Sequence, residues 1–179
     1  MPDTVRTLAE INALFGDGTI PTNQDVRDLA LSFLVHGVIG VLDNATTQAV
    51  TTSYGGIVFP TELHSRGVTT NLVTGTITTP TELTTAKYDL GWDLNFEGQG
   101  NPNAGPYDVA IFINGTTKIG ATERTIEING AKWTQSYCRV PGVSLANGDE
   151  LQLAIKSRTG NKDVLIVNGQ LSCQRLGVE

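Results

Sequence analysis

A strictly alternating stretch near the middle of the chain constrains the fold more than any other feature. It reads KYDLGWDLNFEG and covers residues 87–98. Its apolar residues occupy every second position: Tyr88, Leu90, Trp92, Leu94 and Phe96. Apolar residues at this period indicate a β-strand with one dry face and one solvated face. We therefore predict a long strand here, with these five side chains in the core.

The polar side of this strand carries three carboxylates, Asp89, Asp93 and Glu97, which raises the question of catalysis. Neighbouring members are four residues apart, and at about 3.3 Å per residue they lie roughly 13 Å apart along a strand. Paired glycosidase carboxylates are separated by only about 5 to 9.5 Å. These side chains therefore cannot form a catalytic pair by themselves. We interpret them as a solvated face that discourages edge-to-edge aggregation.

Strand signals recur at short intervals in the rest of the second half. Asn114-Gly115 lies between two apolar runs, which is a strong hairpin signal. Threonine is dense between residues 46 and 86, where 14 occur, and this density of β-branched residues favours extended chain over helix. We predict a mainly β fold, an antiparallel β-sandwich or jelly roll.

Two of the predicted strands are apolar on both faces. In YDVAIFI, residues 107–113, and DVLIV, residues 163–167, successive residues are apolar, so both faces must be covered. The sandwich core covers one face. A neighbouring subunit is the simplest cover for the other, although an N-terminal strand or the N-terminal appendage would also serve. The residues that we predict at this subunit interface are Ala110, Phe112, Leu165 and Val167.

Residues 4–34 show a helical period instead. Apolar residues fall on one stripe in each of two segments, which GDG at residues 16–18 separates. The stripe residues are Leu8, Ile11, Leu14 and Phe15 in the first segment and Val26, Leu29 and Phe33 in the second. Two short amphipathic helices cannot bury both stripes unaided, so they could pair with each other, pack on the following domain or dock on a partner. We predict a helical hairpin that keeps an exposed apolar face. We divide the chain into a helical anchor (1–36), a linker (37–50) and a β-sandwich domain (51–179).

Composition excludes several partners. The net charge is -6 and no Lys/Arg cluster occurs, so the chain lacks the positive surface that a phosphate backbone requires, and we expect no nucleic-acid partner. No apolar run approaches the roughly 20 residues of a membrane span, and the first residues do not resemble a signal peptide, so we expect no membrane partner. Cys138 and Cys173 either form one bridge or are two buried thiols, and the second reading is preferred.

The sequence contains no recognisable catalytic or metal-binding motif. His36 and His64 are its only histidines, and they lack the paired spacing of metal ligands. No nucleophile elbow, phosphate-binding loop or dinucleotide fingerprint is present. We expect a protein that is not an enzyme and holds no cofactor or metal. The segment EGQGNPNAGP, residues 97–106, is interpreted as an exposed loop between two strands, of a kind that can bind ligands.

Several segments together resemble a known family. They are YDLGWDLNF, FINGT, LANGDELQL and LSCQRLG, and with their surroundings they cover about half of the chain. This combination resembles the TNF/C1q-like jelly rolls at the ends of bacteriophage fibres and in phage decoration proteins. The N-terminal segment LAEINALFGDGTIPTNQDVRDLALSF is similar to the short helical anchor of many phage virion proteins.

The resemblance implies a homotrimer whose helices attach to the particle while the β-domain points outward. The chain departs from long fibres because no coiled-coil or repetitive shaft separates the two parts. We therefore expect a capsid decoration (cement) protein or a short head fibre on the outer capsid surface of the virion. It would bind the major capsid protein or another virion protein and stabilise the shell. The alternative is a tail-associated receptor- or carbohydrate-binding module whose partner is a host-surface glycan.

Overall fold

The computed structural model describes residue 13 and residues 35–41, 46–81, 85–98, 105–129 and 133–177. From Val35 onward the described residues form antiparallel strands, together with one short 3₁₀ helix, η2 (Gly120–Thr122). The predicted helical anchor and its seven stripe residues lie outside the described residues. His36, which the prediction assigned to the anchor, is instead the first residue of a strand.

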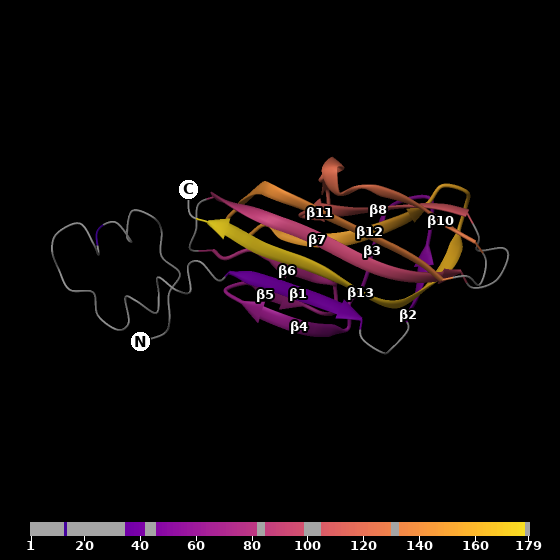
Figure 1. Ribbon diagram of the computed structural model, residues 1–179, viewed down its shortest axis with the longest axis horizontal. Coiled ribbons are helices and arrows are strands. Elements are labelled where there is room, and N and C mark those ends of the chain that lie inside the picture. Colours follow the sequence, from indigo (N-terminus) through magenta and orange to yellow (C-terminus); the bar gives the residue numbers. More distant parts are fainter. Residues whose placement is uncertain are drawn as a thin grey trace.

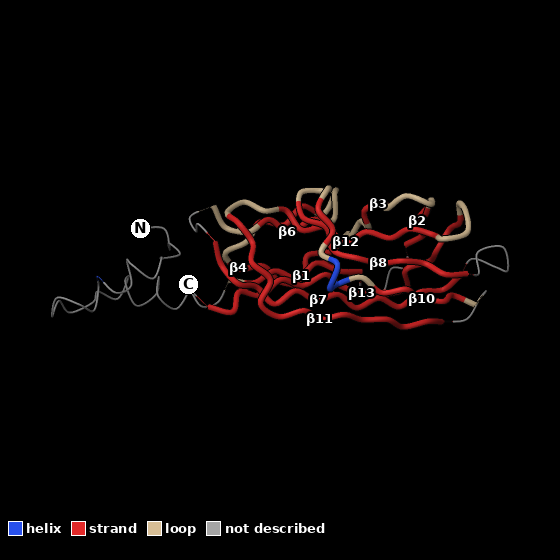
Figure 2. The backbone as a smooth tube through the Cα atoms, turned by 90° about the horizontal axis from the view of Figure 1, so that it is seen from above, coloured by secondary structure: helices blue, strands red, loops and turns tan. Residues whose placement is uncertain are grey.

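Two sheets stack to form a sandwich, which Figure 2 shows edge-on. Sheet A has the order β11 (Trp133–Ala146), β7 (Thr85–Gly98), β13 (Lys162–Gly177), β1 (His36–Val41) and β4 (Thr61–Arg66), and β2 (Thr46–Val50) also pairs with β13. Sheet B has the order β10 (Arg124–Ile128), β8 (Gly105–Ile113), β12 (Glu150–Ser157), β6 (Thr76–Thr78) and β5 (Thr69–Asn71). The short strands β3 (Gly55–Gly56) and β9 (Thr117–Lys118) pair with β12 and β8. Figure 1 shows the strands of sheet A across the front of the sandwich.

The alternating stretch forms β7, at the centre of sheet A between β11 and β13. Its five predicted core residues are all buried, which confirms the dry face. Period-2 alternation places these side chains against the inner face of sheet B. The indole Nε1 of Trp92 donates a hydrogen bond to the carbonyl oxygen of Thr122, 3.0 Å away, so the buried polar atom of this ring is satisfied.

Residues 37–50, predicted as a linker, contain two strands of sheet A. β1 pairs with β13 over its full length, from His36 opposite Gln174 to Val41 opposite Gly169. β2 pairs with the first part of β13, from Val50 opposite Lys162 to Thr46 opposite Ile166. The glycines in HGVIGV suggested a connector, but they permit close packing here. A Cβ atom at Gly40 would lie 2.5 Å from the carbonyl oxygen of Gly169.

Part of the predicted subunit interface is covered within the chain itself. Ala110 is fully buried, and Phe112 is half-buried with its ring centroid 4.9 Å from that of Tyr54. Leu165 and Val167 on β13 are half-buried, and Leu165 pairs with Thr47 of β2. Tyr54, which precedes the main β-strands, therefore covers part of the outer face of sheet B within the chain.

Both cysteines are free and buried. Cys138 lies on β11 and Cys173 on β13, and β7 separates the two strands. Two strand spacings of about 4.8 Å place their Cα atoms beyond the roughly 7 Å that a disulfide can bridge. The preferred reading, two buried thiols, is confirmed.

Candidate functional site

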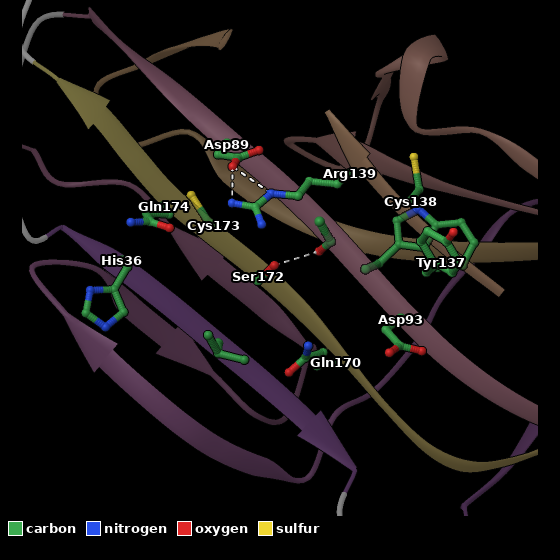
Figure 3. A pocket seen from close by; sticks show the side chains of 13 residues that line it. His36, Asp89, Asp93, Tyr137, Cys138, Arg139, Gln170, Ser172, Cys173 and Gln174 are labelled. Atoms are coloured by element: carbon green, nitrogen blue, oxygen red, sulfur yellow. Dashed lines mark hydrogen bonds and ion pairs between the residues drawn. The ribbon is translucent and has the colours of Figure 1, made fainter. Parts of the chain in front are cut away.

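The outer face of sheet A carries a hollow. Its cavity volume is about 510 Å³, and Figure 3 shows its lining residues, which come from β11, β7, β13 and β1. Strand pairing explains the floor, because Gly91 of β7 stands between Arg139 of β11 and Ser172 of β13. Glycine has no side chain to fill the space, and the Ser172 hydroxyl donates to the Gly91 carbonyl oxygen at 3.2 Å. We call this hollow the sheet A groove.

Asp89 and Arg139 form an ion pair at one end of the sheet A groove. Asp89 is only 8% exposed, whereas the Arg139 side chain is 70% exposed. The guanidinium donates through Nε, at 2.7 Å, and also through Nη2 to a single carboxylate oxygen, Oδ2 of Asp89. The hydrogen bond and the negative charge of Asp89 raise the pKa of Arg139 above its ordinary value. The sequence prediction of a solvated face is therefore wrong for Asp89, which β11 and its arginine cover.

Two carboxylate oxygens of the groove lack hydrogen-bond donors. Among the described residues, no donor reaches Oδ1 of Asp89 or Oδ1 of Asp93, and both atoms are buried from solvent. Figure 3 shows both side chains on the groove side of β7, with no dashed line at Asp93. A buried ionised oxygen without a donor is unfavourable, so each carboxylate is an acceptor that the described chain leaves incomplete.

Exposed apolar side chains also concentrate on sheet A. Of the five large apolar side chains that are exposed in the described residues, three belong to this sheet: Trp133 and Tyr137 on β11 and Leu176 on β13. Tyr137 is 73% exposed and Trp133 67% exposed. Tyr137 also lines the groove, opposite Asp93 in the β11–β7 register.

The outer face of sheet B differs because its buried carboxylate, Asp108, has donors for both oxygens. Asp108 is almost fully buried and accepts hydrogen bonds from Nε of Arg158 at 2.9 Å and from the Thr125 hydroxyl at 2.7 Å. Burial alone would raise the pKa of Asp108, but these donors and nearby positive charges outweigh it and hold that pKa below its ordinary value. Glu123 accepts from Lys118 at 2.8 Å and from the Tyr54 hydroxyl at 2.5 Å.

The remaining predicted site features are distributed over the molecule. The rings of His36 and His64 stack with centroids 4.4 Å apart, where β1 pairs with β4. No group of three metal-ligating side chains occurs within the described ranges. No described helix has the length and apolar composition to cross a membrane. Residues 99–104 of the predicted ligand-binding loop are outside the described residues.

Sequence reasoning missed the main residues of the sheet A groove. Tyr137 and Arg139 lie at alternate positions of WTQSYCRV, residues 133–140, where apolar and polar residues occur on the same side. Their exposure depends on β11 being an edge strand of sheet A. The sequence of this run carries a weak signal, because Trp133 and Tyr137 lie on the same side of a strand. That signal predicts an exposed apolar face but does not identify the neighbouring strands.

Comparisons with known proteins support the fold. No protein-family model and no curated protein sequence matches this chain. Among solved structures, the Eiger TNF of S. frugiperda matches with a TM-score of 0.55 and 10% identity, covering 82% of this chain and 94% of that one. A structure of murine APRIL matches with a TM-score of 0.45 and 11% identity, covering 78% of this chain and 98% of that one. At these identities the first likeness shows the fold alone: a TNF-like jelly roll, as the sequence resemblance implied.

Proposed function

We propose that this protein is a non-enzymatic structural component of a bacteriophage particle. It assembles as a homotrimer through the outer face of sheet A, and its N-terminal residues attach it to the outer capsid surface as a decoration protein or short head fibre. The observation that carries the proposal is the difference between the two outer faces. On sheet B the buried carboxylate of Asp108 is fully partnered, whereas sheet A leaves exposed aromatic side chains and incomplete acceptors beside an open groove.

Burial of such a face is favourable. Exposed apolar surface gains roughly 25 cal/mol for each Å² removed from water, and tyrosine and tryptophan are enriched in interfaces because each combines a large apolar area with one polar atom. Trp133 and Tyr137 have these properties, and both belong to the edge strand β11. Cyclic homo-oligomers of three or more subunits place one patch of each subunit against a different patch of the next, so an edge strand and a groove on one face are suited to a closed ring.

The direction of the strands supports an anchor at one end and a free end opposite. Residues 1–34 precede β1. The first residue of β1, His36, lies in register with Gln174 of β13, and Gln174 pairs with Asp89 of β7. β7 continues nine residues further to Gly98, which at about 3.3 Å per residue is roughly 30 Å away. The proposed anchor therefore joins the sandwich at the end opposite to Gly98.

The mass of the protein in solution tests the trimer. Light scattering after size exclusion is expected to give about three times the chain mass of 19.1 kDa. Tyr137→Asp places a charge on the proposed interface and is expected to give monomers. Val73→Asp is the matched control, because Val73 is 84% exposed and lies between β5 and β6 of sheet B. A monomeric wild-type protein, or trimers in both variants, would contradict the proposed assembly.

Particle binding tests the anchor. Full-length protein is expected to co-sediment with undecorated capsids, and the variants Leu8→Asp and Phe33→Asp are expected to remain trimeric but lose this binding. Each substitution places a charge on an apolar stripe that we assign to the capsid contact. Variants that still decorate capsids as the wild type does would show that another surface makes the attachment.

A receptor- or carbohydrate-binding role is the second candidate, and one observation favours it. Trp133 is exposed on β11 and pairs in register with Glu97, near the end of β7. An exposed indole at the end of a sandwich is a suitable platform for stacking a sugar ring. Binding of the protein on a glycan array, lost in Trp133→Ala but retained in Tyr137→Ala, would support this role. The absence of any glycan signal would contradict it.

A further inference from the structure

Each exposed aromatic side chain of β11 stands directly opposite a carboxylate of β7. Trp133 is in register with Glu97, and Tyr137 is in register with Asp93. Residues directly opposite each other in an antiparallel pair have Cβ atoms about 4.5 to 5.5 Å apart, so each ring has a carboxylate as its neighbour. The face of an aromatic ring attracts a positive charge, and a carboxylate beside it adds a second attraction. Each pair therefore has the chemistry that holds a cationic group.

Of the two pairs, Trp133–Glu97 is the one that is open to a cation. Among the described residues, no cationic side chain forms an ion pair with Glu97. Tyr137, in contrast, lies two residues from Arg139 on the same side of β11, and the Arg139 side chain is 70% exposed. That guanidinium repels a second cation at the Tyr137 ring. The Trp133–Glu97 pair is therefore the candidate binding site.

The neighbours of this pair indicate what else the ligand carries. Glu97 is in register with Leu165 of β13 on its other side, so apolar side chains flank the carboxylate in its row of the sheet. In the next row, the exposed side chain of Gln135 stands opposite Asn95. Side-chain amides both donate and accept hydrogen bonds, as hydroxyl groups do. The site therefore fits a ligand that combines an apolar face, a positive charge and hydroxyl groups.

We infer that this site binds an amino sugar, whose C–H face stacks on the Trp133 indole and whose ammonium group pairs with Glu97. The hydroxyl groups of the sugar form hydrogen bonds with the Gln135 amide. A neutral sugar leaves the carboxylate without a cation, and a lysine side chain has no hydroxyl groups for the amides. This inference rests on the carbohydrate-binding role, the second candidate above, and goes beyond it because it specifies the chemical class of the sugar.

Two matched oligosaccharides test the charge. A short oligomer of glucosamine and the N-acetylglucosamine oligomer of the same length share their rings, but only the first carries ammonium groups at about pH 6. Calorimetric titration of the full-length protein is expected to show at least about tenfold tighter binding of the glucosamine oligomer. Raising the salt from about 0.1 M to about 1 M is expected to reduce this preference, because it shortens the Debye length from about 10 Å to about 3 Å.

Three variants assign the binding to this site. Glu97→Gln keeps the size of the side chain but removes its charge, and it is expected to bring the two affinities within about threefold of each other. Glu127→Gln is the matched control, because Glu127 is an exposed carboxylate on a strand, but it stands opposite Pro106 and no aromatic ring. It is expected to keep the wild-type preference. Trp133→Ala is expected to bind neither oligomer, and circular dichroism confirms that every variant is folded.

The outcomes separate this inference from the proposed trimer. Equal affinity for the two oligomers, or a preference that persists in Glu97→Gln, would overturn the cationic ligand. Trilysine that binds as tightly as the glucosamine oligomer would overturn the sugar and indicate a basic peptide. A trimeric wild type that binds neither oligomer would overturn this inference and leave the assembly intact. A monomeric wild type that prefers the glucosamine oligomer would support this inference and overturn the trimer.

Discussion

Replacement of Thr122 by valine tests how the two sheets are joined. Thr122 ends η2, is 0% exposed, and forms hydrogen bonds toward both sheets. Its hydroxyl accepts from the backbone N–H of Ile111 in sheet B at 2.9 Å and donates to the carbonyl oxygen of Ile119 at 2.7 Å. Its own carbonyl oxygen accepts from the Trp92 indole of sheet A. Valine has the same shape and β-branching, so the substitution removes the hydroxyl and leaves no cavity.

The magnitude follows from the groups that lose partners. The Ile119 carbonyl keeps a hydrogen bond from the backbone N–H of Thr122, so it loses only one of two bonds, which contributes roughly 0.5 to 1.5 kcal/mol. The Ile111 N–H has the Thr122 hydroxyl as its acceptor, and a buried N–H that loses its acceptor costs about 1 to 3 kcal/mol. We expect Thr122→Val to lower the free energy of unfolding by about 2 to 4 kcal/mol.

Urea unfolding, followed by circular dichroism and tryptophan fluorescence at equal protein concentrations, measures this change. Thr122→Ser is the matched control, because it keeps the hydroxyl and removes one methyl group, for an expected loss of only about 1 kcal/mol. The reasoning is refuted if the valine variant is within about 0.5 kcal/mol of the wild type, or if serine destabilises more than valine does.

Three further predictions concern other parts of the sandwich. Gly75→Ala is expected to lower the free energy of unfolding by more than about 2 kcal/mol, because its Cβ atom would lie 2.1 Å from a backbone carbonyl oxygen. Gly115→Ala is the control: Gly115 is also at positive φ, but nothing lies within 4 Å of its Cβ position, so a loss of only about 1 kcal/mol is expected. Urea unfolding measures both changes. Asp108→Asn is expected to be less stable than the wild type at pH 7. Because the pKa of Asp108 is depressed in the folded protein, the difference in stability is expected to shrink as the pH falls below about 4, as measured by thermal unfolding. A difference that stays constant with pH would contradict the lowered pKa. In the native protein, thiol titration is expected to find Cys138 and Cys173 slow to react, because burial raises the pKa of both thiols. After denaturation without reductant, two reactive thiols are expected. Fewer than two would indicate a disulfide.

Local pattern was sufficient to predict the class of fold and the interior of its central strand. The alternation in residues 87–98 predicts which side chains of β7 are buried, because a side chain's face depends only on its position along the strand. The same reasoning placed Asp89 in solvent, and there it failed. Arg139 and β11 cover that carboxylate, and they lie some 50 residues further along the chain. Alternation identifies the two faces of a strand but not what covers the second face.

The boundary between anchor and β-domain required long-range information. Residues 36–44 read as a glycine-interrupted connector because β1 is short and its partner, β13, lies more than 100 residues away. Glycine fits at position 40 because the backbone of Gly169 approaches closely there. The local sequence alone cannot distinguish such a position from a flexible one. Similarly, Ala110 and Phe112 were predicted at a subunit interface from their apolar character, and the local sequence did not indicate that the Phe112 ring packs against Tyr54 of the same chain.

By itself the sequence determined that the chain is a mainly β sandwich, that no recognisable catalytic motif is present, and that some strands need a second cover. Only the tertiary structure decided which face the described residues leave uncovered. Strand order places Tyr137 on an edge, Gly91 beneath a hollow, and the Asp93 carboxylate where no described donor reaches it. The reason is physical: burial along a strand is set by local period, whereas the exposure of a sheet face depends on every other segment that could pack against it.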